Sequence, residues 1–211
     1  VGKDDKNNLE LRKEGTIPAF SFKAKSHIEL GQTLGLIDFD RAKKISGSRA
    51  YVLTGAGALL EQAVMRFTFD TLVEHGYTPM GVPVLVTEQC MVGTGYFPTG
   101  RDQAYCVEED NLALVGTGEV PLAAYHANEM LSEGDLPIKL MTQTGCFRRE
   151  AGSYGRDTKG LYRVHQFNKI EQVVITKNDE ESSKILHDEL LANAEHILHK
   201  LELPYRVVYV C

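Results

Sequence analysis

Two strand-like runs, separated by a glycine-rich segment, dominate the second half of this chain. The later run, Val164 to Ile175, alternates along its length, and the earlier one extends from Met141 to Glu150. Successive side chains of a strand point to opposite faces of a sheet. One face of the later strand would therefore present Arg163, His165, Phe167, Lys169 and Glu171 together. We predict an antiparallel hairpin whose long connecting loop, Ala151 to Tyr162, is functional.

Four other segments have the spacing or the caps of helices. Between Gly55 and Gly76, apolar residues recur at i, i+3, i+4 and i+7, which predicts one stripe packed on a core, and Gly76 suits the residue after the helix end. The stripe consists of Leu60, Ala63, Val64 and Phe67. Asn178, with Glu181 three residues later, predicts a capping box at the start of a helix that Pro204 ends. Two short helices are expected near His27 to Leu34 and Phe39 to Ile45, in an otherwise polar and irregular segment 1–50.

The remaining apolar runs predict short strands. They are Val82 to Val86, Leu112 to Val115, Ile138 to Thr144 and Arg206 to Cys211. Pro83 lies inside the first run and donates no ladder hydrogen bond, which places that strand at an edge or an interface. Residues 93–102, GTGYFPTGRD, have turn chemistry and predict a loop that could cover a site. The predicted strands and helices do not alternate as βαβ units. The predicted fold class is therefore α+β, with a mostly antiparallel sheet flanked by helices.

The charge of the chain is unevenly distributed. The chain carries 23 Lys and Arg against 29 Asp and Glu, yet residues 147–169 hold six of the cations and two of the acids. No run approaches the ~18 apolar residues of a membrane span, so we expect a cytoplasmic protein without membrane contact. The four cysteines lie far apart and the seven histidines are scattered, so neither a disulfide framework nor a metal site is expected.

A basic, glycine-rich loop suits a polyphosphate ligand. The guanidinium of Arg148 offers a planar fork of donors that matches phosphate oxygens two at a time, and glycines let backbone N–H groups approach those oxygens. Phe167, on the strand that leaves the loop, offers a flat apolar face to a purine. Taken alone, such cations more often form a solvated face, and an aromatic residue on a strand more often belongs to a core.

The sequence motifs of several segments resemble those of the class II aminoacyl-tRNA synthetases. F-R-x-E at residues 147–150 and R-V-H-Q-F-x-K-x-E at residues 163–171 are similar to motif 2, in the form found in the seryl-tRNA synthetase family. Gly76-Tyr77 leading to Pro83 is similar to motif 1, which builds the dimer interface. Thr117-Gly118-Glu119 resembles the T-x-E signature of the serine pocket, and residues 27–49 resemble the lead-in to the catalytic domain.

The resemblance implies a partial class II catalytic domain over residues 1–211, with residues 1–50 as lead-in and residues 51–211 as a core with motifs 1 and 2. It also implies that the N-terminal coiled-coil arm and motif 3 are lacking here, so that Mg²⁺ ligands would follow Cys211 and this piece alone would be inactive. Gly116 stands where many relatives have proline, which could loosen that turn.

Residue roles follow from the same resemblance. Arg148 would be catalytic, binding the α-phosphate of ATP and the serine carboxylate, and Glu171 would receive the serine hydroxyl. The ammonium group of serine would be held at Thr117, Gly118 and Glu119. The ATP site would comprise Arg148 and Arg149, Glu150 on the adenine side, Arg163 at the outer phosphates, the Val164 backbone at the base and Phe167 stacked on adenine. Pro83 would lie in the dimer interface, and the 151–162 loop would be mobile until nucleotide binds.

The implied function is a homodimeric serine–tRNA ligase, which uses ATP to form seryl-adenylate and transfers serine to tRNA(Ser). Two rivals share the core: a ligase that activates serine for another acceptor, and a non-catalytic paralogue that acts as a binding module. Single residues have plainer readings too. Glu119 could be a helix-start carboxylate favoured by the dipole, and Glu171 could form a cross-strand pair with a lysine.

Overall fold

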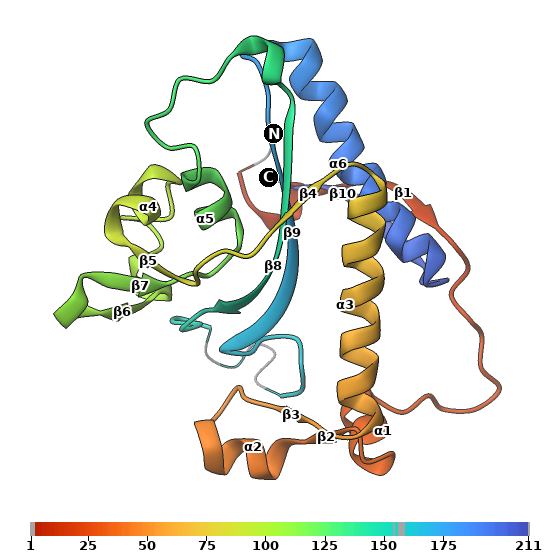
Figure 1. Cartoon of the computed structure of the whole chain (residues 1–211). Helices are drawn as coiled ribbons and strands as arrows, with labels where there is room; N and C mark the ends of the chain where they lie inside the picture. The colour runs from red at the N-terminus through yellow and green to blue at the C-terminus, as the bar shows by residue number, and fades with distance from the viewer. Residues whose placement is uncertain (1–2, 154, 156–158, 211) are drawn as a thin grey trace. The chain divides into compact units, whose positions relative to one another are not determined.

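The computed structural model describes residues 3–153, 155 and 159–210 (Figure 1). Their contacts separate into two compact units: Lys25–Asp179, and Val1–Ala24 together with Glu180–Cys211. Of the predicted 151–162 loop, residues 154 and 156–158 lie outside the described residues, so its predicted mobility is untested.

The larger unit contains a three-stranded sheet in the order β4-β8-β9. Strands β8 (Ile138–Phe147) and β9 (Gln166–Ile175) pair antiparallel from Ile138 opposite Ile175 to Phe147 opposite Gln166, which confirms the predicted hairpin. Strand β4 (Thr78–Met80) pairs parallel to β8 and was not predicted. This single parallel pair leaves the sheet mostly antiparallel.

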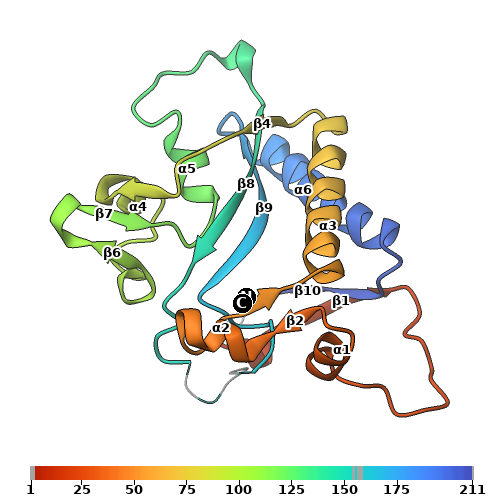
Figure 2. The same cartoon turned by 60° about the horizontal axis from the view of Figure 1, so that its bottom comes forward.

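Helix α3 (Ala56–Glu74) and helix α5 (Glu119–Ala124) lie on opposite sides of the β8–β9 hairpin, as both views show (Figures 1 and 2). The α3 helix itself was predicted, but its buried stripe was wrong. Leu60 is 61% exposed, whereas Met65 and Leu72 are buried. The helix carries apolar side chains on more than one face, so the periodicity alone did not identify the face that packs.

A second sheet of three short strands holds the main cluster of buried apolar side chains. Its order is β5 (Leu85–Thr87), β7 (Leu112–Leu114), β6 (Tyr105–Val107), all antiparallel. With helix α4 (Glu88–Gly93), it surrounds the buried residues Val86, Met91, Phe97, Ala104, Ala113, Val115 and Val120. Phe97 is 3% exposed, so the predicted 93–102 loop is fixed to this core by its own aromatic side chain. Strand β5 begins after Pro83, not before it as predicted.

The lead-in segment folds as α1 (His27–Thr33), β2 (Ile37–Asp38), α2 (Phe39–Ser46) and β3 (Val52–Leu53), with β2 and β3 antiparallel. Both short helices are confirmed. Ser26 and Glu29 form a capping box at α1, and Asp38 accepts a hydrogen bond from the Arg41 N–H at 2.8 Å at the start of α2. These caps satisfy N–H groups that have no partner within the helix.

The smaller unit pairs β1 (Leu9–Glu14) antiparallel with β10 (Tyr205–Tyr209) and contains α6 (Glu180–Lys200). Strand β1 contradicts the prediction of an irregular segment. Arg12 Nη2 lies 2.5 Å from a carboxylate oxygen of Glu195 on α6. Helix α6 begins at Glu180, two residues after the predicted start at Asn178. Cys211, the last residue of the predicted final strand, lies outside the described residues.

Four single-turn 3₁₀ helices complete the described elements: η1 (Asp5–Asn7), η2 (Arg101–Gln103), η3 (Glu108–Asp110) and η4 (Glu133–Asp135). In the part of the chain that the structure describes, no helix combines the length and apolar character needed to cross a membrane.

Candidate active site

A cluster of three polar side chains lies where α5 begins beside strand β9. Its members are Thr117, Lys169 and Glu171, called the Thr117 cluster below. The Thr117 hydroxyl donates to Glu171 Oε2 at 2.5 Å and accepts from Lys169 Nζ at 2.8 Å, and Lys169 Nζ also pairs with the same Glu171 oxygen. The Glu119 N–H donates to the Thr117 hydroxyl at 3.3 Å. One donor and two acceptor positions are all that a hydroxyl has, so the Thr117 hydroxyl is fully engaged.

Gly118 brings the backbone against the sheet at this cluster. A Cβ atom at Gly118 would lie 2.8 Å from Thr142 Cγ2, 3.1 Å from Thr144 Oγ1 and 3.2 Å from Glu171 Cβ. Thr142 and Thr144 are buried. Any larger residue would therefore push the 116–119 turn away from strands β8 and β9, and the hydrogen bond between Thr117 and Glu171 would lengthen.

Glu119 is the first residue of α5 and is exposed. This position matches the alternative interpretation of Glu119, in which its carboxylate lies at the start of a helix and interacts with the helix dipole. The alternative interpretation of Glu171, a cross-strand pair with a lysine, is correct about the type of partner and wrong about where that partner lies. Glu171 does pair with a lysine, but Lys169 lies two residues away on the same strand face and not across the sheet.

Arg148 connects the hairpin to the same turn. Its Nε donates to the carbonyl oxygen of Gly116 at 3.1 Å, one residue before Thr117. Its guanidinium carbon lies 5.2 Å from the centroid of the Phe167 ring, within the range of a cation–π contact. Among the described residues, nothing accepts a hydrogen bond from its two terminal nitrogens. The described contacts thus fix the base of the guanidinium and leave its fork of donors for a ligand.

The backbone of Arg148 is held by His165. The Arg148 N–H donates to the His165 carbonyl at 2.9 Å, and His165 Nδ1 lies 3.0 Å from the Arg148 carbonyl oxygen. A carbonyl oxygen can only accept, so His165 Nδ1 carries the proton. This pair extends the β8–β9 ladder by one step beyond Phe147 and Gln166, and it rigidifies the point at which Arg148 leaves the sheet.

Glu150 and Arg163 face each other across the two ends of the loop. Arg163 Nη1 donates to Glu150 Oε2 at 2.8 Å, and the Glu150 side chain is 12% exposed. Glu150 has a φ of 54°, in the left-handed region that a residue with a side chain seldom occupies. Ser153 stabilises this turn, because its hydroxyl donates to the Glu150 carbonyl at 2.5 Å.

Arg49, at the end of the lead-in segment, joins both ends of the loop. Its Nη2 donates to the Ser153 carbonyl at 2.8 Å and its Nη1 to the Arg163 carbonyl at 3.2 Å. In turn, the His165 N–H donates to the Arg49 carbonyl at 3.0 Å. A second contact from the lead-in segment lies nearby: the Leu161 N–H donates to His27 Nε2 at 3.2 Å. The lead-in segment therefore supports the hairpin that carries Arg148.

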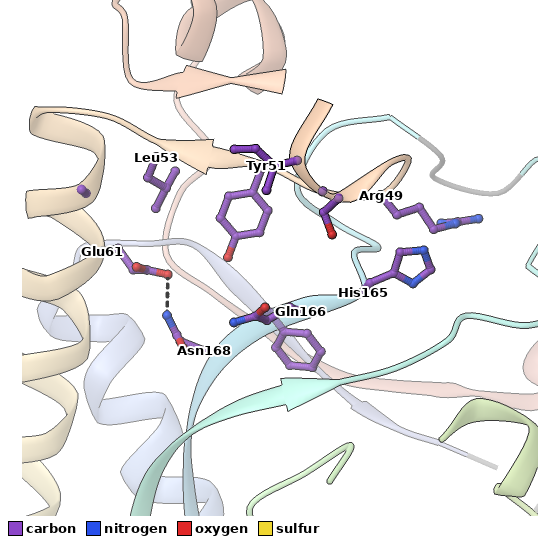
Figure 3. A pocket seen from close by; sticks show the side chains of 12 residues that line it. Arg49, Tyr51, Leu53, Glu61, His165, Gln166 and Asn168 are labelled. Carbon is purple, nitrogen blue, oxygen red and sulfur yellow. Dashed lines mark hydrogen bonds between the residues drawn. The ribbon is translucent and has the colours of Figure 1, made fainter. Parts of the chain in front are cut away.

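A pocket of about 440 Å³ opens beside the start of β9 (Figure 3). Its lining consists of Ile45, Ser46, Arg49, Ala50, Tyr51 and Leu53, of Ala58 and Glu61 of α3, and of residues 165–168. Tyr51 points into it, and Asn168 Nδ2 donates to Glu61 Oε1 at 3.1 Å across it. Phe167 lines this pocket and also contacts Arg148, so its ring borders both regions.

Tyr96 packs against the turn at Gly116, on the side of the second sheet. A Cβ atom at Gly116 would overlap the Tyr96 hydroxyl, so glycine here makes room for that ring. Burial raises the pKa of Tyr96 above its ordinary value of 10.0, and the nearby charge of Arg148 opposes that shift. Gly116 is buried, and its packing against Tyr96 is the opposite of the loosened turn that the sequence suggested.

The structure brings together Arg148, Phe167, Thr117, Gly118 and Glu171 as one connected set, with Glu150 and Arg163 paired at the loop ends. Other predicted residues lie apart. Arg149 is exposed and lines a different pocket with Arg101, Tyr105 and Glu108. Val164 is 5% exposed, and Pro83 is exposed in the segment between β4 and β5.

Two residues that contact this set, Lys169 and Arg49, had no predicted role. Lys169 shares its strand face with Phe167 and Glu171, so the alternation could have identified it. Arg49 lies about a hundred residues away along the chain from its partners, and no local pattern indicates such a contact. Within the described ranges, no group of three or more His, Cys, Asp or Glu side chains could hold a metal ion.

Comparison with known proteins identifies the family of this chain. A family model for the tRNA synthetase class II core domain (G, H, P, S and T) matches residues 105–211. The serine–tRNA ligase of Leptospira biflexa is 47% identical over all of this chain and 50% of its own length, and that of Thermosipho melanesiensis is 49% identical over all of this chain and 49% of its own length. The chain thus spans about half the length of the curated relatives it matches.

Solved structures give the same result for the fold. The structure of seryl-tRNA synthetase from Pyrococcus horikoshii complexed with ATP superimposes with a TM-score of 0.94 at 39% identity, covering 100% of this chain and 51% of that one. The cytoplasmic serine–tRNA ligase of Naegleria fowleri in complex with AMP gives 0.94 at 33% identity, covering 100% and 50%. The α+β prediction is confirmed as the class II synthetase fold, and the chain belongs to the tRNA synthetase class II core domain family (G, H, P, S and T).

Proposed function

We propose that this chain carries the serine-activation site of a serine–tRNA ligase. The observation that best supports the proposal is the connection between Arg148 and the Thr117 cluster. Arg148 Nε binds the Gly116 carbonyl, and the next residue, Thr117, binds Glu171. The guanidinium that we assign to phosphate binding therefore contacts the same turn as the acceptors that we assign to a small hydroxylated amine. The relatives named serine–tRNA ligase and the ATP and AMP in the related structures support the same assignment.

In the first step, a serine carboxylate oxygen attacks the α-phosphorus of ATP, forming seryl-adenylate and releasing pyrophosphate. The step needs positioning and charge stabilisation more than proton transfer. The terminal nitrogens of Arg148 would bind the α-phosphate and the attacking carboxylate. Phe167 would stack on adenine, with Glu150 and the Val164 backbone at the base edge and Arg163 at the outer phosphates. Arg149 would add positive charge from its exposed position.

The pairing of Glu150 with Arg163 constrains this proposal. Their 2.8 Å contact joins a residue assigned to the adenine side with one assigned to the outer phosphates. Nucleotide binding would therefore separate the two side chains and exchange one charged hydrogen bond for contacts to ATP. Until the ligand arrives, the pair would hold both side chains at the two ends of the loop.

The amino-acid pocket would use the opposite end of the turn. Thr117, Gly118 and Glu119 would hold the serine ammonium group, with the Glu119 carboxylate supplying the charge. The Thr117 hydroxyl would first release its 3.3 Å contact with the Glu119 N–H, because both of its acceptor positions are otherwise in use. Glu171 Oε1, which accepts no hydrogen bond from a described residue, would receive the serine hydroxyl. A site that pairs with a substrate hydroxyl can reject the analogue lacking it by roughly 10⁴-fold, because its own polar group is left unpaired. Alanine would be excluded on this ground.

In the second step, a ribose hydroxyl at the 3′ end of tRNA(Ser) would attack the seryl carbonyl, and AMP would leave. We propose that Mg²⁺ accompanies ATP and that the protein works in the cytoplasm as a homodimer. Exposed apolar side chains on α3 support an interface there that includes the Pro83 segment: Leu59, Leu60 and Val73 are 71%, 61% and 42% exposed. We retain residues 1–211 as part of one catalytic domain, with residues 1–50 as its lead-in.

Serine-dependent ATP–pyrophosphate exchange by the full-length protein tests the first step. We expect exchange with serine and at least about a thousandfold less with alanine. Equal exchange with both, or none with serine, would refute the assignment. Charging of tRNA(Ser) then tests the second step: exchange without charging would indicate a ligase for another acceptor, and the absence of both would indicate a binding module.

A further inference from the structure

The contacts of Lys169 point to a role that the proposed function leaves open. Lys169 lies on the face of β9 between Phe167 and Glu171, and its side chain is 30% exposed. Its ammonium contacts both Thr117 and Glu171, the two side chains assigned to the amino-acid pocket. A cation thus lies inside a pocket whose ligand also carries a cation.

The two carboxylates of the pocket differ in their charge balance. Glu171, whose side chain is 21% exposed, is paired with Lys169. Glu119 is exposed and forms no ion pair with any described residue. An uncompensated carboxylate attracts a cation, whereas a compensated one can still accept a hydrogen bond from a neutral donor. The arrangement therefore assigns the substrate ammonium to Glu119 and a neutral group to Glu171.

We propose that Lys169 neutralises Glu171 and thereby makes the side-chain end of the pocket selective for a hydroxyl over a protonated amine. This inference rests on the proposed function. Lys169 is a positioning residue: it fixes Glu171 Oε2 and the Thr117 hydroxyl, which leaves Glu171 Oε1 for the substrate. It also repels a second positive charge, because specificity follows equally from a repulsive group placed against the wrong ligand.

The test compares serine with L-2,3-diaminopropionate, in which an amine that is protonated at neutral pH replaces the hydroxyl. ATP–pyrophosphate exchange with the full-length protein gives kcat/KM for each amino acid. In Lys169→Met, we expect the preference for serine over diaminopropionate to fall by about tenfold or more, since Glu171 is then uncompensated. Lys169→Arg keeps the charge and should preserve the preference within about threefold. Every variant is assayed with the same two amino acids at the same pH. A change in the ratio of their kcat/KM values therefore comes from the pocket and not from the protonation of the substrates.

Two further variants keep the test decisive. Lys177→Met removes an exposed lysine beyond the end of β9 and should leave the preference unchanged. Lys169→Gln is neutral but retains a donor for Thr117, and should lose the preference as Lys169→Met does, even if the methionine variant folds poorly. Lack of serine-dependent exchange in the wild type would refute the proposed function itself. If the wild type exchanges with serine and both neutral variants keep its preference, the role of Lys169 is overturned and the proposed function stands.

Discussion

The hydroxyl of Thr117 lies 2.5 Å from a carboxylate oxygen of Glu171. The two residues come from different parts of the fold, one from the turn before α5 and the other from the middle of β9. Their contact joins the second sheet to the central hairpin, and the same turn accepts the hydrogen bond of Arg148 at Gly116. The turn at residues 116–117 therefore contacts the hairpin at two points, Glu171 and Arg148.

Thr117→Val should raise the KM for serine by about tenfold to a hundredfold and leave the KM for ATP nearly unchanged. Valine keeps the shape of threonine but leaves Glu171 and Lys169 without a shared partner, and a lost hydrogen bond to a charged group costs about 1.5–3 kcal/mol. Steady-state exchange kinetics give both constants. Thr87→Val, at an exposed residue before α4, is the matched control. An equal rise in both KM values would indicate a general disturbance of the fold.

Gly118→Ala should destabilise the protein by about 1–3 kcal/mol and reduce serine activation. The added methyl group meets Thr142 at 2.8 Å and must displace either the turn or strand β8. Urea unfolding gives the change in the free energy of unfolding. Gly134→Ala is the control, because its added Cβ would meet only the Ser132 hydroxyl oxygen at 3.7 Å. Equal stability of the two variants would show that Gly118 has no packing role.

Arg49→Ala should raise the KM for ATP by about tenfold. The substitution removes two hydrogen bonds that hold the ends of the loop, one to Ser153 and one to Arg163. Nucleotide titration of the variant measures the loss directly. Arg66→Ala removes a solvent-exposed ion pair with Asp70 on α3 and should have little effect, since such pairs contribute about 0–1 kcal/mol. An unchanged ATP affinity in Arg49→Ala would contradict the role of the lead-in segment.

Alkaline pH should destabilise the wild type more than Tyr96→Phe. Burial raises the pKa of Tyr96 in the folded state. A group with a raised folded pKa contributes stability that is fully present below its unfolded pKa and is lost as the pH rises through the folded pKa. Phenylalanine cannot ionise, so the variant should lose less unfolding free energy between about pH 9 and pH 11. Tyr125→Phe, at an exposed position, is the control. If Tyr96→Phe loses as much as the wild type, the hydroxyl is not buried in solution.

Much of the hairpin could be predicted because its signals are local. The strand alternation of β9 and the glycines of the loop are properties of consecutive residues. Both long helices, α3 and α6, have apolar residues at helical spacing, although this spacing did not identify the buried face of α3. The resemblance to motif 2 then identified Arg148, Phe167 and Glu171 on this hairpin as candidate site residues. Strand pairing of this kind leaves little freedom in which side chains share a face.

Other features depend on distant partners and left no local pattern. Strand β4 has three residues, and it exists as a strand because β8 lies beside it. Strand β1, LELRKE, is mostly charged, and each of its residues is exposed, so its pairing with β10 decides its conformation. Arg49 acts through the carbonyl groups of Ser153 and Arg163, which carry no residue-specific signal. In each case tertiary contacts outweighed intrinsic propensity.

The role of Arg148 is the centre of this account, and Arg148→Lys in the serine-dependent exchange assay tests it most directly. Lysine keeps the positive charge but lacks the planar fork and the Nε donor to Gly116. We predict that kcat/KM for serine falls by about a hundredfold or more in Arg148→Lys, while urea unfolding shows that the variant is still folded. Arg66→Lys should behave like the wild type in both measurements. Exchange by a folded Arg148→Lys variant at the wild-type rate would contradict the account.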